Sequence, residues 1–205
     1  MYVPKLYRNT NFPEIEQFLQ KNSFASLISV HEGKPWTTHI PLELQTNEKD
    51  ERVLWGHLSR ANPQWKSFEA HPDVLAVFMG PHTYISSSWY DHVNVPTWNY
   101  IAVHVTGKVK IVEGEQLYES LKRLVNKYEA VSKQPVSIET MPQDYVRKEM
   151  KGVVGLEISI DKMEGNWKLS QNRDDKNYVN IISELEKLNE LNAGLIAEAM
   201  KKMRP

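Results

Sequence analysis

The stretch from Val95 to Val112 carries the longest regular alternation of apolar and polar side chains in the chain. Apolar residues recur at every second position from Ile101 to Ile111, and polar or small residues fill the positions between them. A period of two is typical of a half-buried strand and does not fit a helix. Gly107 interrupts the apolar face, where a bulge or barrel corner lets a long strand bend. The stretch therefore predicts the spine of a small β-barrel.

The rest of the chain supplies further strands with helices inserted between them. The pattern predicts an α+β barrel of six to eight strands. Strands are expected at 24–30, 36–44, 53–58, 74–79, 84–88 and 154–160, and a return strand at 167–169. Between them we expect a hairpin turn at 31–34, a break at Gly80-Pro81 and a turn at 161–165. Helices are expected at 13–22, from Asn62-Pro63, at 117–128, at 145–150 and at 178–203, where Gly194 and the neighbouring Asn residues are points of division.

Composition excludes several functional classes. The 205 residues contain no cysteine, so there is no disulfide framework, thiol nucleophile or cysteine-ligated metal site. A net charge of −1 gives no global attraction to nucleic acid. No apolar run reaches the length of a membrane span and no signal peptide begins the chain, so we expect a cytoplasmic protein without membrane contact. The seven histidines show no zinc-site spacing and no Gly-x-Ser-x-Gly motif occurs, so we expect neither bound metal nor serine-hydrolase chemistry.

The first candidate binding motif runs from Gly56 to Pro63, from a strand through a turn into a helix start. Free N–H groups and the positive dipole end at a helix N-terminus suit a phosphate. Ser59 adds a hydroxyl donor, Arg60 a forked charge, and Asn62 is a good cap. The alternative is a capped helix with a surface arginine, because every helix start has the same free donors.

The second motif is the polar run Lys168–Arg173, which follows a strand. Its donors suit an anion or the carbonyl groups of a heterocycle. The alternative is a solvated loop before the last helix.

The third motif is the strand Pro35–Pro41, where Thr37 and His39 share one face. These side chains suit a ligand that lies across the strand. The alternative is an edge strand with a polar outer face.

The fourth motif joins Ser86–Tyr90 to Pro96–Tyr100. Hydroxyl groups, an amide and two indoles close together are typical of a ligand pocket. The alternative is aromatic side chains buried by the barrel.

Together these segments resemble the PaiB family of FMN-binding negative transcriptional regulators, over nearly the whole chain. The runs that carry the resemblance are Phe24–Leu27, Thr38–Pro41, Gly56–Trp65, Phe78–Ser86, Val95–Tyr100 and Lys168–Arg173.

The resemblance implies a flavin-binding split β-barrel of the pyridoxamine-phosphate-oxidase-like kind, with inserted helices. It implies a barrel domain over residues 1–170, a C-terminal helical extension over 171–205 packed on it, and a homodimer with FMN at the subunit interface. The candidate FMN contacts are Ser59, Arg60 and Asn62 for the phosphate, Thr38, His39, Lys168 and Gln171 for the ring edge, and Trp98 or Trp89 of the partner chain for the ring face.

The resemblance also implies a repressor, for sporulation and protease synthesis. DNA binding rests on the family alone, because the sequence shows no helix-turn-helix and the last helix mixes acidic with basic residues. Two other functions stay open. One is a flavin-dependent oxidoreductase, since a flavin in this fold does not by itself establish or exclude catalysis. The other is a flavin-free dimer that acts as a scaffold.

Overall fold

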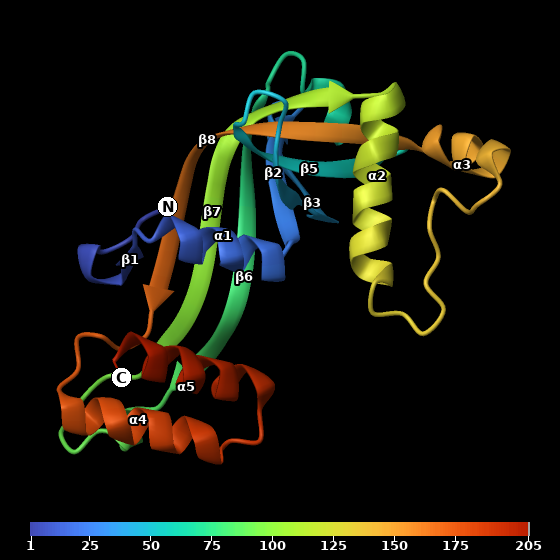
Figure 1. Cartoon of the computed structure of the whole chain (residues 1–205). Coiled ribbons are helices and arrows are strands. Elements are labelled where there is room, and N and C mark those ends of the chain that lie inside the picture. The colour runs from blue at the N-terminus through green and yellow to red at the C-terminus, as the bar shows by residue number, and fades with distance from the viewer. Residues whose placement is uncertain (205) are drawn as a thin grey trace. The chain divides into compact units, whose positions relative to one another are not determined.

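The computed structural model describes residues 1–204, and over these residues it contains one eight-stranded antiparallel sheet and several helices (Figure 1). The strand order is β3-β2-β6-β7-β8-β5-β4, and the short β1 pairs with β8. The strands are β1 (Arg8–Asn9), β2 (Phe24–His31), β3 (Lys34–Pro41), β4 (Glu43–Thr46), β5 (Arg52–Ser59), β6 (Asp73–Ile85), β7 (Thr97–Val112) and β8 (Val153–Lys168). The α-helices are α1 (Phe12–Lys21), α2 (Gly114–Glu129), α3 (Gln143–Met150), α4 (Asp175–Lys187) and α5 (Leu191–Met203), and the 3₁₀ helices are η1 (Lys5–Tyr7), η2 (Pro63–Ser67) and η3 (Ser87–Trp89).

The chain forms two compact units, and each takes residues from separate parts of the sequence. The central unit comprises Glu16–Val77 and Val105–Met163. The terminal unit comprises Met1–Ile15, Phe78–His104 and the described chain from Glu164 onward. Strands β6, β7 and β8 contribute residues to both units. The expected division into a barrel domain over 1–170 and a C-terminal extension over 171–205 stays a prediction. The last residue of that extension, Pro205, lies outside the described residues.

The core of each unit consists of aliphatic and aromatic side chains from strands and helices. Burial of this apolar surface is the main stabilising contribution to the fold. Fully or almost fully buried residues include Leu27, Leu42, Leu54 and Phe68 in the central unit, and Ile85, Leu169, Ile181 and Leu185 in the terminal unit. No helix among residues 1–204 has both the length and the apolar character to cross a membrane.

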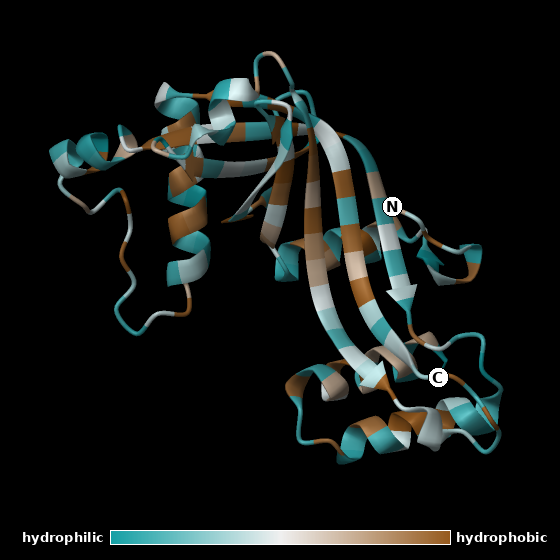
Figure 2. Cartoon of the chain, turned by 180° about the vertical axis from the view of Figure 1, so that it is seen from behind, coloured by the Kyte–Doolittle hydropathy of each residue, from teal (hydrophilic) through white to brown (hydrophobic). Residues whose placement is uncertain are grey.

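Strand β7 confirms the long strand expected from the alternation. It runs for 16 residues, and its polar and apolar bands alternate visibly in Figure 2. Val103, Val105 and Val109 are buried, whereas Lys108 and Lys110 are exposed. At Gly107, an added Cβ would come within 2.0 Å of the Ser159 carbonyl oxygen of β8. A glycine is therefore needed for the close approach of the two backbones.

The expected hairpin and edge strand are also confirmed. Strands β2 and β3 pair antiparallel through a turn in which Glu32 and Gly33 have φ values of 50° and 74°. Positive φ at both central residues is typical of the tight hairpin turn that matches strand twist. Strand β3 stands at one end of the strand order, which explains why Pro41 is tolerated there.

Two expected interruptions of strands are wrong. Strand β6 continues through Gly80-Pro81. Its pairing with β2 covers only Leu75 to Val77, so on that side of β6 no β2 residue needs the N–H that Pro81 lacks. Strand β8 continues through residues 161–165, where a turn was expected, and includes most of the expected return strand at 167–169. Gly165 is not a turn residue: it pairs with Asn9, and an added Cβ would come within 2.6 Å of Trp167.

The expected final helix is two helices, and the break at 188–190 includes one of the expected asparagines, Asn189, but not Gly194. Helix α4 begins after Asp174, whose side chain accepts a hydrogen bond from the Asn177 N–H, and ends before Leu188, which is extended. Gly194 lies within the first turn of α5. The helices pack together in the terminal unit (Figure 1), and the Tyr178 hydroxyl donates to the Met200 carbonyl over 2.8 Å.

Candidate functional site

A buried hydrogen-bond network joins β2, β3 and η2 in the central unit. Its centre is Gln64, which is fully buried. The Gln64 Nε2 donates to Ser29 Oγ over 2.9 Å and to the Leu27 carbonyl over 3.2 Å, and its Oε1 accepts from Thr38 Oγ1 over 2.6 Å. Asn62 Nδ2 donates to Thr38 Oγ1 over 2.8 Å. We call Thr38, Asn62, Gln64 and Ser29 the Gln64 network.

The Gln64 network brings together two predicted site residues, Thr38 and Asn62, which lie 24 positions apart in the sequence. Each has a defined role. Asn62 caps η2 by accepting from the Gln64 N–H over 3.1 Å, so its amide orientation is fixed. The single hydroxyl hydrogen of Thr38 goes to Gln64, so towards any ligand Thr38 acts as an acceptor. Sequence reasoning overlooked Gln64, and the available signal was a polar residue directly after a capping Asn-Pro pair.

His39 lies on the exposed side of β3, apart from the Gln64 network. Its Nδ1 is 2.9 Å from Ser26 Oγ, and its ring stacks on Phe24 at a centroid distance of 6.5 Å. Phe24 leaves 66% of its surface exposed. The neighbouring Thr37 is exposed as well. This face of the edge strand is therefore polar with one open aromatic group.

Ser59 and Arg60 lie at the end of β5, before η2. The expected helix is here only a five-residue 3₁₀ helix, so its dipole is weak. Ser59 Oγ accepts from the Ala61 N–H over 3.3 Å. Arg60 donates through Nε to the Lys151 carbonyl over 2.9 Å and through Nη2 to the Val153 carbonyl over 3.1 Å. Two of its five N–H donors are thus engaged in fixing the α3–β8 turn, and the side chain remains 44% exposed.

Trp98 and Lys168 lie together in the terminal unit. Lys168 Nζ donates to Thr97 Oγ1 over 2.5 Å and to the Trp98 carbonyl over 2.9 Å. The Trp98 ring is 5.9 Å from Tyr84 and 6.3 Å from His82, centroid to centroid, and 53% of the residue is exposed. We call Trp98, Tyr84 and His82 the Trp98 patch.

Two effects shape the charge of Lys168. Partial burial lowers the pKa of its ammonium group, and the nearby positive charge of Arg173 lowers this pKa further. Gln171 is turned inward: its Oε1 accepts from the Leu169 N–H over 2.8 Å, and its Nε2 donates to the Trp167 carbonyl. Lys168 is thus available to a ligand at the surface, whereas Gln171 mainly holds its own loop.

The same loop is held in a strained conformation. Ser170 has a φ of 61°, which is uncommon for a residue other than glycine, and it is buried. Asn99, fully buried on β7, donates through Nδ2 to Ser170 Oγ over 3.0 Å and accepts from it over 3.1 Å. This reciprocal pair is a positioning feature that sequence reasoning did not include.

The fourth motif forms part of a surface hollow in the terminal unit. Ser88, Trp89 and Tyr90 line a pocket of about 450 Å³ together with the first turns of α4. The Tyr90 hydroxyl is buried and has no hydrogen-bond partner among the described residues. Trp98 is not among the residues that line this pocket, so the two halves of the motif form separate surfaces.

Comparisons with known proteins support a common family and fold. Residues 1–162 match a protein-family model described as "Putative FMN-binding domain". The chain is 44% identical over 202 residues to "Protease synthase and sporulation protein PAI 2" of Bacillus subtilis, covering 98% of this chain and 97% of that protein. It is 27% identical to an uncharacterized protein of Emericella nidulans, covering 92% of this chain and 91% of that protein.

Solved structures share the fold at low identity. The flavocytochrome Anf3 from Azotobacter vinelandii superposes with a TM-score of 0.61 at 17% identity, covering 87% of this chain and 78% of that one. A FAD- and heme-binding protein from Mycobacterium smegmatis gives a TM-score of 0.61 at 13% identity, covering 84% and 78%. The predicted fold class, an α+β split barrel of the flavin-binding kind with inserted helices, is confirmed.

Proposed function

Because the chain belongs to the PaiB family, we propose that it is an FMN-binding protein that regulates gene expression as a homodimer. The observation that carries the proposal is the Gln64 network, which holds Thr38 and Asn62 in one fixed arrangement. Thr38 presents an acceptor, because its hydrogen is donated to Gln64. Asn62 uses one amide hydrogen on Thr38 and keeps a second donor.

This donor and acceptor pair suits the pyrimidine edge of a flavin. That edge presents an N–H group between two carbonyl groups. Thr38 would accept from the N–H, and Asn62 would donate to a carbonyl. Because both side chains are already fixed, little side-chain entropy is lost when they bind the ring. His39, on the other side of β3, is proposed as a further contact to the ring edge.

Charged and aromatic residues are proposed for the remaining parts of FMN. Ser59 and Arg60 would bind the phosphate, with the Arg60 donors that the Lys151 and Val153 carbonyls leave available. Lys168 of a second copy would complete the polar contacts to the ring, with Gln171 holding the loop that carries it. A second copy of the chain would supply Trp98 as the ring wall, because an exposed indole is suited to stacking on a flat heterocycle.

The FMN site is tested by titrating the purified protein with FMN and recording the visible absorbance spectrum. We expect the shifted spectrum of a bound flavin, with saturation at one FMN per chain, and a dimer in sedimentation analysis. A protein that never takes up FMN, at any concentration up to millimolar, would overturn the proposal.

The regulatory role is inferred from the resemblance, and the similar Bacillus subtilis protein is named for protease synthesis and sporulation. The test is a binding screen of the FMN-loaded dimer against genomic DNA fragments, at low salt and with the flavin oxidised or reduced. We expect a subset of fragments to be retained. Absence of retention in both redox states would contradict the role.

A flavin-dependent oxidoreductase is the second candidate, favoured by the open Trp98 patch. A substrate could approach a ring stacked there, because the indole is half exposed. Steady oxidation of NADPH by the FMN-loaded protein would support this activity, and a bound flavin that NADPH never reduces would exclude NADPH as its reductant.

A further inference from the structure

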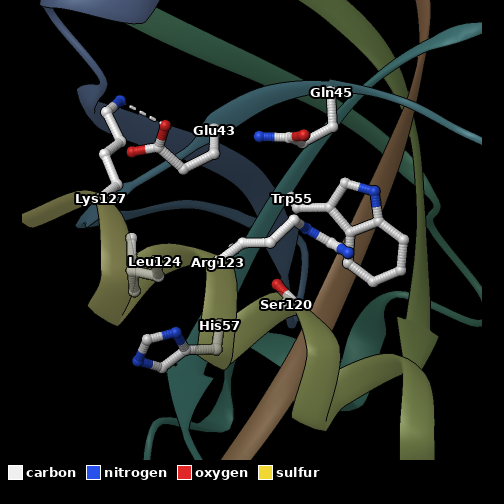
Figure 3. A pocket seen from close by; sticks show the side chains of 9 residues that line it. Glu43, Gln45, Trp55, His57, Ser120, Arg123, Leu124 and Lys127 are labelled. Carbon is white, nitrogen blue, oxygen red and sulfur yellow. Dashed lines mark hydrogen bonds and ion pairs between the residues drawn. The ribbon is translucent and has the colours of Figure 1, made fainter. Parts of the chain in front are cut away.

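A small cavity lies under helix α2 in the central unit, and charged, polar and apolar side chains line it (Figure 3). None of the predicted flavin contacts lines it. Its volume is about 60 Å³, far below the 300 Å³ or more of typical organic-ligand pockets. By the same measure one water needs about 10–15 Å³, so the space suits an ion of a few atoms. The lining residues are Glu43, Gln45, Trp55, Gly56, His57, Ser120, Arg123, Leu124 and Lys127.

The face that α2 turns to this cavity is open to solvent. Ser120, Arg123, Leu124 and Lys127 follow the spacing of one helical face, and three of these four are polar or charged. Arg123 and Lys127 are exposed and Ser120 and Leu124 are half-buried, whereas Leu117 is the buried residue of α2. A small polar solute can therefore reach the cavity from outside.

One positive charge in the lining is not balanced. Glu43 is buried, and its Oε2 lies 2.5 Å from Lys127 Nζ, while its Oε1 accepts from the Tyr128 hydroxyl over 3.0 Å. Lys127 thus neutralises Glu43. Among the described residues Arg123 forms no ion pair, and its guanidinium lies 5.4 Å above the Trp55 ring (Figure 3). The cavity therefore carries a net charge of about +1 and favours an anion.

The remaining lining groups suit an oxyanion. Arginine is well shaped to bind phosphate or carboxylate oxygens. Ser120 and Gln45 add hydrogen-bond donors, and His57 adds a ring N–H. Burial lowers the pKa of His57, so its imidazole is neutral at physiological pH. Glu43 retains free lone pairs, because each carboxylate oxygen can accept two hydrogen bonds.

We propose that this cavity is a binding site for hydrogen phosphate, separate from the flavin site. Arg123 supplies the charge, and Ser120, Gln45 and His57 supply donors. The carboxylate of Glu43 accepts the O–H of the anion. Sulfate has the same shape but no O–H at neutral pH, so it would face the Glu43 carboxylate with no hydrogen to donate. The geometry thus predicts selection of phosphate over sulfate.

The test is calorimetric titration of the full chain with inorganic phosphate and with sulfate, at pH 7.5 and constant ionic strength. We expect one phosphate per chain and sulfate binding at least tenfold weaker. The variant Arg123→Gln should weaken phosphate binding at least tenfold. The matched variant Arg147→Gln should leave it unchanged, because Arg147 is 73% exposed on α3. Equal affinity for both anions, or no effect of Arg123→Gln, would overturn the proposal.

Two further measurements separate this site from others. Glu43→Gln should make the phosphate and sulfate affinities nearly equal. If this variant does not fold, Gln45→Ala is the substitute, because it leaves the Glu43 contacts in place. It should weaken phosphate binding severalfold.

Saturating FMN should leave phosphate binding unchanged, and competition would assign the anion to the flavin site and overturn the proposal. Phosphate binding in a protein that never binds FMN would still support the cavity, while it would count against the proposed flavin function.

Discussion

In the central unit, the amide of Gln64 is fully buried and bonded to Thr38, Ser29 and the backbone, whereas in the terminal unit Trp98 leaves 53% of its surface exposed. The first arrangement fixes polar groups before any ligand arrives. The second arrangement presents a half-exposed aromatic ring to the solvent. We therefore expect the Gln64 network to contribute stability and the recognition of polar groups, and the Trp98 patch to contribute contact area with a ligand.

The largest effect is expected from Gln64→Leu. The substitution removes the side-chain partner of Thr38 and of the buried Ser29, and the donor to the Leu27 carbonyl, so we expect a loss of about 3 kcal/mol in the free energy of unfolding. Urea denaturation measures it. In contrast, Trp98→Ala should change this free energy by less than about 1 kcal/mol. Equal losses in the free energy of unfolding for the two variants would contradict the contrast between the Gln64 network and the Trp98 patch.

Arg60→Ala should weaken FMN binding by about 1.5–3 kcal/mol, because it removes a charged hydrogen bond to the phosphate. Riboflavin, which lacks the phosphate, is the control ligand. Its affinity should stay unchanged if the loss is specific. A similar loss for FMN and riboflavin would mean that Arg60 acts by fixing the α3–β8 turn, through the Lys151 and Val153 carbonyls.

Trp98→Ala should weaken FMN and riboflavin equally, by about 1 kcal/mol, because stacking involves the ring and not the phosphate. Trp89→Ala tests the alternative ring wall, and we expect no effect on either ligand because Trp89 lies in a separate pocket of the terminal unit. An unchanged flavin spectrum in Trp98→Ala would exclude Trp98 from the ring wall.

The smallest effect concerns pH. Burial lowers the pKa of His57 from its ordinary value of 6.5, so below that pH the unfolded chain binds more protons than the folded one. The free energy of unfolding should therefore fall as the pH drops through about 6.5. His57→Gln should reduce this fall, as measured by urea denaturation between pH 7.5 and 5.5. An identical pH dependence in both proteins would contradict this role for burial.

Much of the fold was predictable from local patterns. The alternation from Ile101 to Ile111 predicts β7, and the turn residues at Gly33 predict the hairpin, because both are set by residues close in sequence. The continuity of β6 and β8 was not, because a strand tolerates a Pro where no partner needs its N–H, and a Gly where another segment lies too close for a side chain. That depends on pairing with distant segments, as between Gly165 and Asn9.

The residues of the candidate site stay a prediction, and their arrangement could not be predicted from local patterns. Thr38 and Asn62 were predicted separately, and only the fold brings them together through Gln64. Ser170 and Asn99 each belong to a predicted polar motif, but their pairing was missed because they lie 71 positions apart in the sequence. Arg60 was identified as a charge near a helix start, while its bonds to the Lys151 and Val153 carbonyls depend on residues about 90 positions away.

The central claim is that Thr38, oriented by Gln64, binds the flavin ring. The most direct measurement is FMN affinity, by visible absorbance titration, in the matched variants Thr38→Val and Thr37→Val. Both remove one hydroxyl from β3, but only Thr38 belongs to the Gln64 network. We predict weaker binding, by about tenfold, in Thr38→Val alone, as expected for one lost hydrogen bond. Unchanged affinity in Thr38→Val, or an equal loss in both variants, would contradict the claim.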